Sequence, residues 1–267
     1  MAQVLTFPHH RTHGFPTTAP TQRHQFSPHP SWIVDLIDTL KPYQERVWNC
    51  PLVQEASTGS LSLRQMQGWL IQLYPFIETF PQWIAMNITK ASDPYAREIL
   101  IDNIRVEKWH AKQWVDMTEA FGVSLDELHH ASILPEVEAL THYMWSINLR
   151  GTLAESLSAM TYAIEGTTHG IAQAVLQGFP KYDGRYGIRL TKRAYAWMQN
   201  HARYDETHPL EALEIIKRES PPEEIQSRVK YAAQRSMEYF FMALDACYRH
   251  FAPEDCSFHS LPASAAA

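Results

Sequence analysis

The sequence predicts an all-α protein, a bundle of about seven helices around one hydrophobic core. From Ser31 onward the apolar residues recur at helical spacing, and no stretch alternates with the period of two that is typical of a half-buried strand. With 267 residues, 45% of them hydrophobic, the chain is long enough to bury a substantial core. Short connections between helical segments favour a bundle. The expected segments are about 31–48, 62–90, 94–121, 135–149, 152–177, 187–218 and 221–251.

The two ends of the chain differ from the middle in composition. The first 30 residues contain five prolines and five of the fourteen histidines, without an apolar run long enough for a signal peptide or a membrane span. We expect residues 1–30 to be a disordered leader rich in His and Pro. Residues 252–267 are expected to be a disordered tail. The functional domain is therefore predicted over 31–251.

Charge and cysteine content exclude several classes of partner. A net charge of −6 gives no reason to expect nucleic acid or an anionic membrane as a partner. The three cysteines, Cys50, Cys247 and Cys256, form no C-x-x-C motif, so neither a disulfide framework nor a zinc ribbon is indicated. Reduced thiols are typical of a cytoplasmic protein, which is the localisation we expect.

The second segment, 62–90, contains two prolines in its interior. Ser60 or Ser62 is expected to cap its start. Pro75 and Pro81 predict a kinked or broken helix, because proline removes a backbone hydrogen bond and clashes with the preceding turn. A bent helix here either opens a cavity in the bundle or is part of the ordinary core. In the first case, the cavity wall is formed by Tyr74, Phe76, Ile77, Phe80 and Trp83. The polar candidates for a substrate pocket on this helix are Tyr74, Glu78, Thr79 and Gln82.

The third segment, 94–121, carries an E-x-x-H pair. Glu107 and His110 share a helix face because residues three apart are neighbours there. A carboxylate in such an apolar surrounding is costly unless it is paired or bound to a metal. Arg105 and Lys108 provide the competing interpretation, a surface cluster of salt bridges. Gly122 is expected to end this helix. The apolar neighbours are Ile101, Ile104, Val106, Trp109 and Trp114.

In segment 152–177, Glu165 and Gly166 interrupt the apolar stripe. A carboxylate next to the core, followed by a glycine that permits close approach, is a candidate for a bridging metal ligand. The alternative is a glutamate at the edge of the stripe that reaches water. His169, one turn further on, is a ligand, a donor behind a ligand, or a half-buried histidine with no such role.

Segment 187–218 contains His201, Asp205 and His208 at positions i, i+4 and i+7. These positions lie along one side of a helix, so the three side chains point the same way. Imidazole and carboxylate together suit iron or manganese better than calcium or a zinc ribbon. Taken alone, the pattern also fits a solvated helix face. The last segment, 221–251, starts at Pro221 and Pro222, with two glutamates in its first turn.

Together the candidates are three carboxylates and three imidazoles from three helices. A single metal that also binds oxygen and a substrate would not need six protein ligands. Two Fe(II) ions carry four positive charges, and three carboxylates neutralise three of them. About one positive charge remains for an anionic ligand. The ligand count therefore favours a dinuclear site.

Three motifs resemble the ligand segments of the haem-oxygenase-like di-iron oxidases, and within that family the undecene-forming medium-chain fatty-acid decarboxylases. The motifs are Asn103-Ile-Arg-Val-Glu-x-x-His110, Tyr162-Ala-Ile-Glu-Gly166 and the segment from His201 to Ile216. The resemblance covers about 31–250 and implies a haem-oxygenase-like fold without haem. It further implies that Glu107, His110, bridging Glu165 and His201 hold one iron, and that Asp205 and His208 complete the second.

The resemblance also implies a reaction. Two Fe(II) ions and dioxygen as co-substrate would oxidise a small carboxylate- or amine-bearing molecule, with oxidative decarboxylation of a medium-chain fatty acid to a terminal alkene as the leading hypothesis. N-oxygenation of an amine or oxidative C–C cleavage of an amino acid, as in natural-product biosynthesis, is the first alternative. The second is a metal-free bundle of the thiaminase or quinone-cofactor-synthase type. An external electron donor and a homodimer are compatible with the di-iron oxidase.

Overall fold

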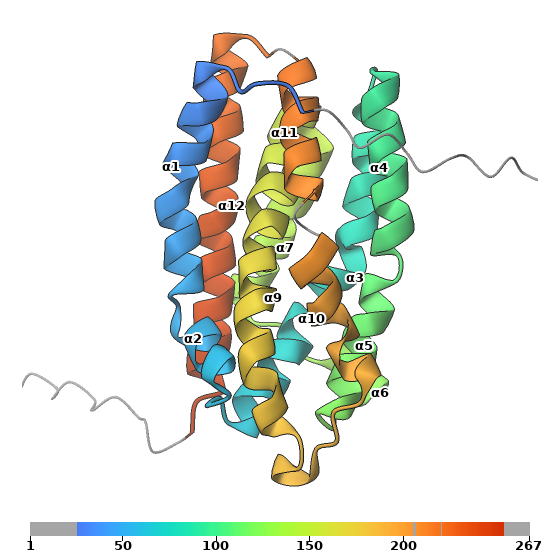
Figure 1. The fold of residues 1–267 in the computed structure, drawn as a ribbon, viewed down its shortest axis with the longest axis vertical. Helices are drawn as coiled ribbons and strands as arrows, with labels where there is room; N and C mark the ends of the chain where they lie inside the picture. Colours follow the sequence, from blue (N-terminus) through green and yellow to red (C-terminus); the bar gives the residue numbers. More distant parts are fainter. Residues whose placement is uncertain (1–25, 205–206, 220, 254–267) are drawn as a thin grey trace, which may run out of the picture.

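The protein is a bundle of helices, seen in a computed structural model that describes residues 26–204, 207–219 and 221–253. In these residues the structure contains helices and connecting turns and no strand. The longer helices run roughly along the long axis of the molecule (Figure 1). The predicted all-α fold class is therefore confirmed.

The chain up to residue 150 forms helices α1 to α7, several of which begin at recognisable caps. The Ser62 side chain accepts the backbone N–H of Gln65, and the Gln65 side chain returns the bond, which is a capping box. Ser124 and Glu127 repeat that arrangement. The bounds are α1 Ser31–Trp48, α2 Pro51–Thr58, α3 Leu63–Lys90, α4 Pro94–Glu107, α5 His110–Ala120, α6 Leu125–His130 and α7 Pro135–Arg150.

The remainder of the described chain begins with one long stretch whose hydrogen-bonding pattern changes along its length. It passes from α-helix through a π-helix and back to α-helix, and short 3-10 turns follow. The bounds are α8 Leu153–Leu157, the π-helix η1 Ser158–Glu165, α9 Gly166–Gly178, η2 Phe179–Tyr182, η3 Arg185–Gly187, α10 Lys192–Tyr204, α11 His208–Arg218 and α12 Glu223–His250.

Seven segments were too few. Segment 94–121 divides at Lys108 and Trp109 into α4 and α5, and segment 187–218 yields α10 and α11, with residues 205–206 between them outside the described chain. Helix α2 was missed although it carries Pro51 in its first turn and ends at Gly59, whose φ of 65° is the left-handed conformation that glycine adopts readily. The helical spacing of apolar residues does not reveal a break when the apolar face of one helix continues into the next.

Helix α3 is continuous from Leu63 to Lys90, so the predicted break at Pro75 or Pro81 is wrong. Buried side chains lie on both sides of the prolines, among them Trp69, Phe76 and Trp83. Packing of these flanks against neighbouring helices offsets the lost backbone hydrogen bonds.

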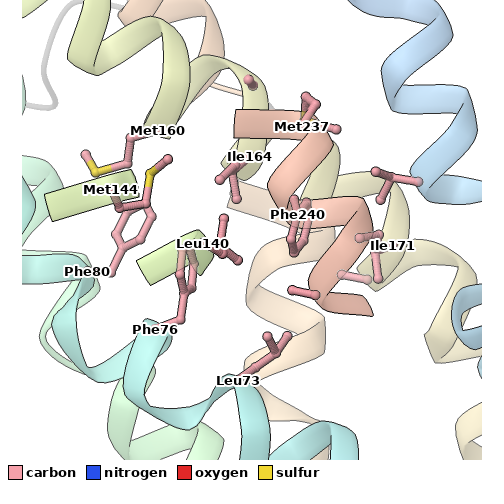
Figure 2. Close-up of a cluster of buried hydrophobic side chains, with 14 of the residues drawn as sticks. Leu73, Phe76, Phe80, Leu140, Met144, Met160, Ile164, Ile171, Met237 and Phe240 are labelled. Carbon is pink, nitrogen blue, oxygen red and sulfur yellow. The ribbon is translucent and has the colours of Figure 1, made fainter. Parts of the chain in front are cut away.

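The core lies where α3, α7, η1, α9 and α12 meet. Figure 2 shows side chains from these five elements pointing toward one another. The labelled members are Leu73, Phe76, Phe80, Leu140, Met144, Met160, Ile164, Ile171, Met237 and Phe240. Three of them, Phe76, Phe80 and Ile164, also border the site described next. None of the described helices has an apolar stretch that could cross a lipid bilayer.

Candidate metal centre

The π-helix η1 ends at Glu165, and every one of its residues is buried. A π-helix turns more widely than an α-helix and is found mostly at functional sites. Glu165 is only 6% exposed, so the alternative of a glutamate at the edge of the stripe reaching water is wrong. Its burial raises the pKa of its carboxyl group, although His208 opposes that shift.

Glu107 and His110 flank the break between α4 and α5. Glu107 is the last residue of α4 and His110 the first of α5, and Glu107 Oε2 lies 2.7 Å from His110 Nδ1. Both side chains are buried, which contradicts a surface salt-bridge cluster; Arg105 instead pairs with exposed Asp102. The apolar surrounding expected from the neighbouring sequence is wrong in part, because Ile101, Val106 and Trp109 are exposed.

Glu165 and His208 form the second acid–imidazole pair. His208 is the first residue of α11, and its Nδ1 lies 2.5 Å from Glu165 Oε1. Burial lowers the pKa of His208, but the Glu165 carboxylate outweighs it and raises that pKa to about 9. Gly166 permits the approach of α11, since a Cβ there would lie 3.2 Å from Pro209 Cγ. That is the close approach expected of a glycine at this position.

His201 joins the site from α10. Its Nδ1 lies 2.8 Å from the carbonyl oxygen of Trp197, and its ring stacks on the Trp197 ring with centroids 3.7 Å apart. A hydrogen bond from Nδ1–H to a carbonyl leaves Nε2 as the ligating nitrogen. Its ring centroid lies 4.3 Å from that of His110. Burial, and secondly the neighbouring His110, lower the pKa of His201 well below its usual value, which favours the neutral form that binds metals.

His169 lies behind His201 and does not line the cavity described below. Its Nδ1 is 3.0 Å from the backbone carbonyl oxygen of His201, and the side chain is half-buried. Of the three roles left open for His169, the geometry fits a donor behind a proposed ligand.

The residues present fit a transition-metal site. Ligand atoms of Glu107, Glu165 and His208 all lie within 4.8 Å of one another. Two carboxylates this close repel each other unless a cation or a proton lies between them. Within the part of the chain that the structure describes, buried Glu107 Oε1 has no hydrogen-bond partner, although buried polar atoms normally have one. A set of carboxylates and imidazoles suits iron or manganese.

Of the six predicted ligands, the structure brings five together, and Asp205 lies outside the described residues. The five are Glu107, His110, Glu165, His201 and His208. Their role as ligands stays a prediction.

An apolar cavity of about 30 Å³ adjoins these side chains. That volume holds about two water molecules. Phe76, Ile77 and Phe80 of α3 line it, whereas Tyr74 and Trp83, the other two residues expected in a cavity wall, do not. The full lining is Phe76, Ile77, Phe80, Glu107, His110, Ile164, Glu165, Thr168, Trp197 and His201. No local pattern of residues distinguishes Thr168 or Trp197 as part of the site.

The polar residues expected to form the substrate pocket are not among those lining this cavity. Tyr74 OH donates to Glu78 Oε1 at 3.1 Å and lies 3.2 Å from His129 Nε2. The Thr79 hydroxyl donates to the Pro75 carbonyl, and Gln82 is exposed. Residues 76, 77 and 80 face the cavity, so the helical phase directs these polar neighbours elsewhere.

Comparison with known proteins gives the family. The sequence pattern of the TENA/THI-4/PQQC family matches residues 37–250. The chain belongs to this family. A TenA homologue from Pseudomonas syringae pv. tomato is 31% identical, with a TM-score of 0.77 over 85% of this chain and 100% of the homologue. A Shewanella denitrificans domain with a haem-oxygenase-like fold has a TM-score of 0.67 at 16% identity, over 82% of this chain and 93% of that domain. The chain therefore has the haem-oxygenase-like fold.

Among curated relatives, a protein of Chlamydia muridarum named 4-aminobenzoate synthase is 26% identical over 173 residues. The match covers 62% of this chain and 70% of the relative. Family members include enzymes, and the arrangement of buried acids and imidazoles in this chain is one that enzymes use.

Proposed function

We propose that this protein is a dioxygen-dependent oxidase with two non-haem iron ions, acting on a small molecule that bears a carboxylate or an amine. The observation that carries the proposal is the buried Glu107 carboxylate, one of whose oxygens has no hydrogen-bond partner among the described residues, beside a second buried carboxylate and three imidazoles. When bound, the metal ions supply the redox chemistry that activates dioxygen.

The side chains of this site have separable tasks in that reaction. Glu107 and Glu165 supply the negative charge that would hold the ions, and the imidazoles of His110, His201 and His208 supply nitrogen ligands, with a bound metal ion displacing the proton that Glu165 stabilises on His208. Trp197 orients His201 through its carbonyl group and by stacking. Phe76 and Phe80 give the cavity an apolar wall, which limits the access of bulk water to reactive species.

Cavity size ranks the substrates. Room for about two water molecules does not admit a twelve-carbon chain unless the wall moves. The relative named 4-aminobenzoate synthase makes a product with both an amine and a carboxylate, which supports a small substrate of that kind. Oxidation of an amine or amino acid therefore takes precedence over decarboxylation of a medium-chain fatty acid.

The fatty-acid reaction is the second candidate, because the cavity wall of Phe76, Ile77 and Phe80 is apolar. Movement of α3 side chains would be required to lengthen the cavity for an acyl chain. Such a substrate would place its carboxylate at the metal ions and its chain against this wall.

The test begins with anaerobic Fe(II) loading of the full-length protein, followed by metal analysis and oxygen uptake. We expect about two iron equivalents, and faster oxygen uptake with an amine or amino acid than with dodecanoate. His110→Ala should lose iron and oxygen uptake, whereas His130→Ala, a change of an exposed histidine, should keep both.

Each contrary result has a definite meaning. Absence of bound iron in the wild type rejects the proposal and favours the metal-free thiaminase or quinone-cofactor-synthase type, which family membership also allows. Iron binding with a response to dodecanoate alone rejects the amine substrate and selects decarboxylation.

A further inference from the structure

Residues 26–30 cross from the start of α1 to α11, the helix that begins with His208 (Figure 1). The backbone N–H of Ser27 donates to Glu214 Oε2 at 3.0 Å, and its hydroxyl lies 3.0 Å from both carboxylate oxygens. Lys217 Nζ donates to the Ser27 carbonyl at 2.6 Å. Part of the predicted leader is thus bound to the folded domain.

The contact covers an ion pair. Lys217 Nζ lies 2.6 Å from Glu214 Oε2, and the two side chains are only 7% and 6% exposed. A buried ion pair is tolerated only where further hydrogen bonds satisfy its remaining donors and acceptors. Ser27 supplies these bonds from outside the helix. The cluster of Ser27, Glu214 and Lys217 is called the latch below.

Helix α11 has 11 residues, which is too short for an isolated helix to be stable in water, so tertiary contacts hold it. Its apolar side chains Leu213, Ile215 and Ile216 are buried in the bundle. Its C-terminal half is held by the latch and by Arg218, which lies 3.3 Å from Asp93 Oδ2 and over the Tyr95 ring. Glu214 is six residues from His208, about 9 Å along the helix axis. Fixing the latch therefore fixes the position of the first turn.

We propose that the latch is a positioning element that holds α11 so that His208 remains in the metal centre. The inference rests on the proposed function, because it gives His208 the role of a metal ligand. Ser27, Glu214 and Lys217 do not touch the metal centre themselves; they act through the helix. Release of the latch leaves His110 and His201 in place and loosens the His208 half of the site.

The experiment uses metal-free, full-length protein and amide hydrogen exchange of residues 208–217. Ser27→Ala removes the hydroxyl bonds, and Lys217→Met removes the cation while keeping a long side chain. We expect exchange in α11 to rise about fivefold or more, as loss of one hydrogen bond of ordinary net strength implies, with α10 unchanged. Ser27→Thr keeps the hydroxyl and should restore slow exchange.

A second measurement links the latch to the site. Free Mn(II) is followed by electron paramagnetic resonance during titration of each variant, and Ser27→Ala should bind manganese about tenfold more weakly than the wild type. The control is Lys230→Met, which breaks an ion pair with Asp35 between α12 and α1 and does not touch α11.

Unchanged exchange in α11 overturns the proposal. Faster exchange with undiminished manganese binding also overturns it, because the latch would then hold the helix without positioning His208. If the wild type binds no manganese, the proposed metal centre fails, and exchange at Glu211, whose N–H donates to the Thr207 carbonyl at 2.9 Å, decides whether the latch holds the first turn.

Discussion

The two acid–imidazole pairs of the site differ in how the chain brings them together. Glu107 and His110 are three residues apart at one helix break, whereas Glu165 and His208 are 43 residues apart and meet only when α11 packs on η1. In the first pair, Glu107 Oε1 has no hydrogen-bond partner from residues 26–204, 207–219 or 221–253, and the second pair is closer, at 2.5 Å. The local pair thus joins residues that are close in the sequence, but one of its carboxylate oxygens has no hydrogen-bond partner among the described residues. The distant pair depends on the tertiary fold and also stabilises it.

The largest expected effect is on metal binding, which should be lost on changing a proposed ligand and kept on changing a surface residue. Glu165→Gln removes the carboxylate nearest both His208 and Glu107, so binding of the metal ions should weaken by at least about a hundredfold, beyond the effect typical of groups that only orient a ligand. Iron content after anaerobic loading measures this. Glu138→Gln, a change of an exposed glutamate on α7, is the matched control. Full iron content in Glu165→Gln would remove Glu165 from the ligand set.

The two acid–imidazole pairs should contribute differently to the free energy of unfolding of the metal-free protein. Glu165→Gln should lower the free energy of unfolding by about 3 kcal/mol, because it breaks a buried pair between distant elements. Glu107→Gln should cost about 1 kcal/mol or less, since its carboxylate is already partly unsatisfied. Urea unfolding of both variants without metal gives the two values. Equal losses of unfolding free energy in the two variants would contradict this difference between the distant and the local pair.

A smaller effect is expected behind His201. His169→Ala removes the contact with the His201 carbonyl oxygen, so metal affinity should fall about threefold, less than for groups that bond directly to a ligand side chain. Manganese titration measures the change, and His142→Ala, an exposed histidine on α7, serves as control. A hundredfold loss would instead make His169 a ligand.

The smallest effect concerns a charge outside the site. Burial lowers the pKa of Lys90 to about 8, although Glu155 opposes the shift, and Lys90 donates to Ser156 Oγ. Between pH 8 and 10 the unfolded chain binds more protons at this lysine than the folded one, so stability should rise with pH there. Lys90→Met should lose that rise in urea unfolding at pH 8, 9 and 10. An identical slope in the variant would show that Lys90 is not its source.

Local features of the sequence predicted much of the fold. The starts of α3 and α12 follow from a serine cap and from prolines with acidic residues, and α1 and α7 from periodicity. The break between α4 and α5 was missed because the apolar face continues across it. Glu78 and Gln82 were assigned to a pocket by residue type, and they do not line the cavity because their direction depends on how α3 is rotated in the bundle.

By itself the sequence determined which side chains could form the site and that they lie on helices, because residue chemistry and helical spacing are local properties. Only the tertiary structure decided that Glu165 is buried at the end of a π-helix and that His208 reaches it. The structure also decided that Ser27, in the expected leader, holds α11. These outcomes depend on packing between segments far apart in the chain, and no local pattern encodes the distance between such segments.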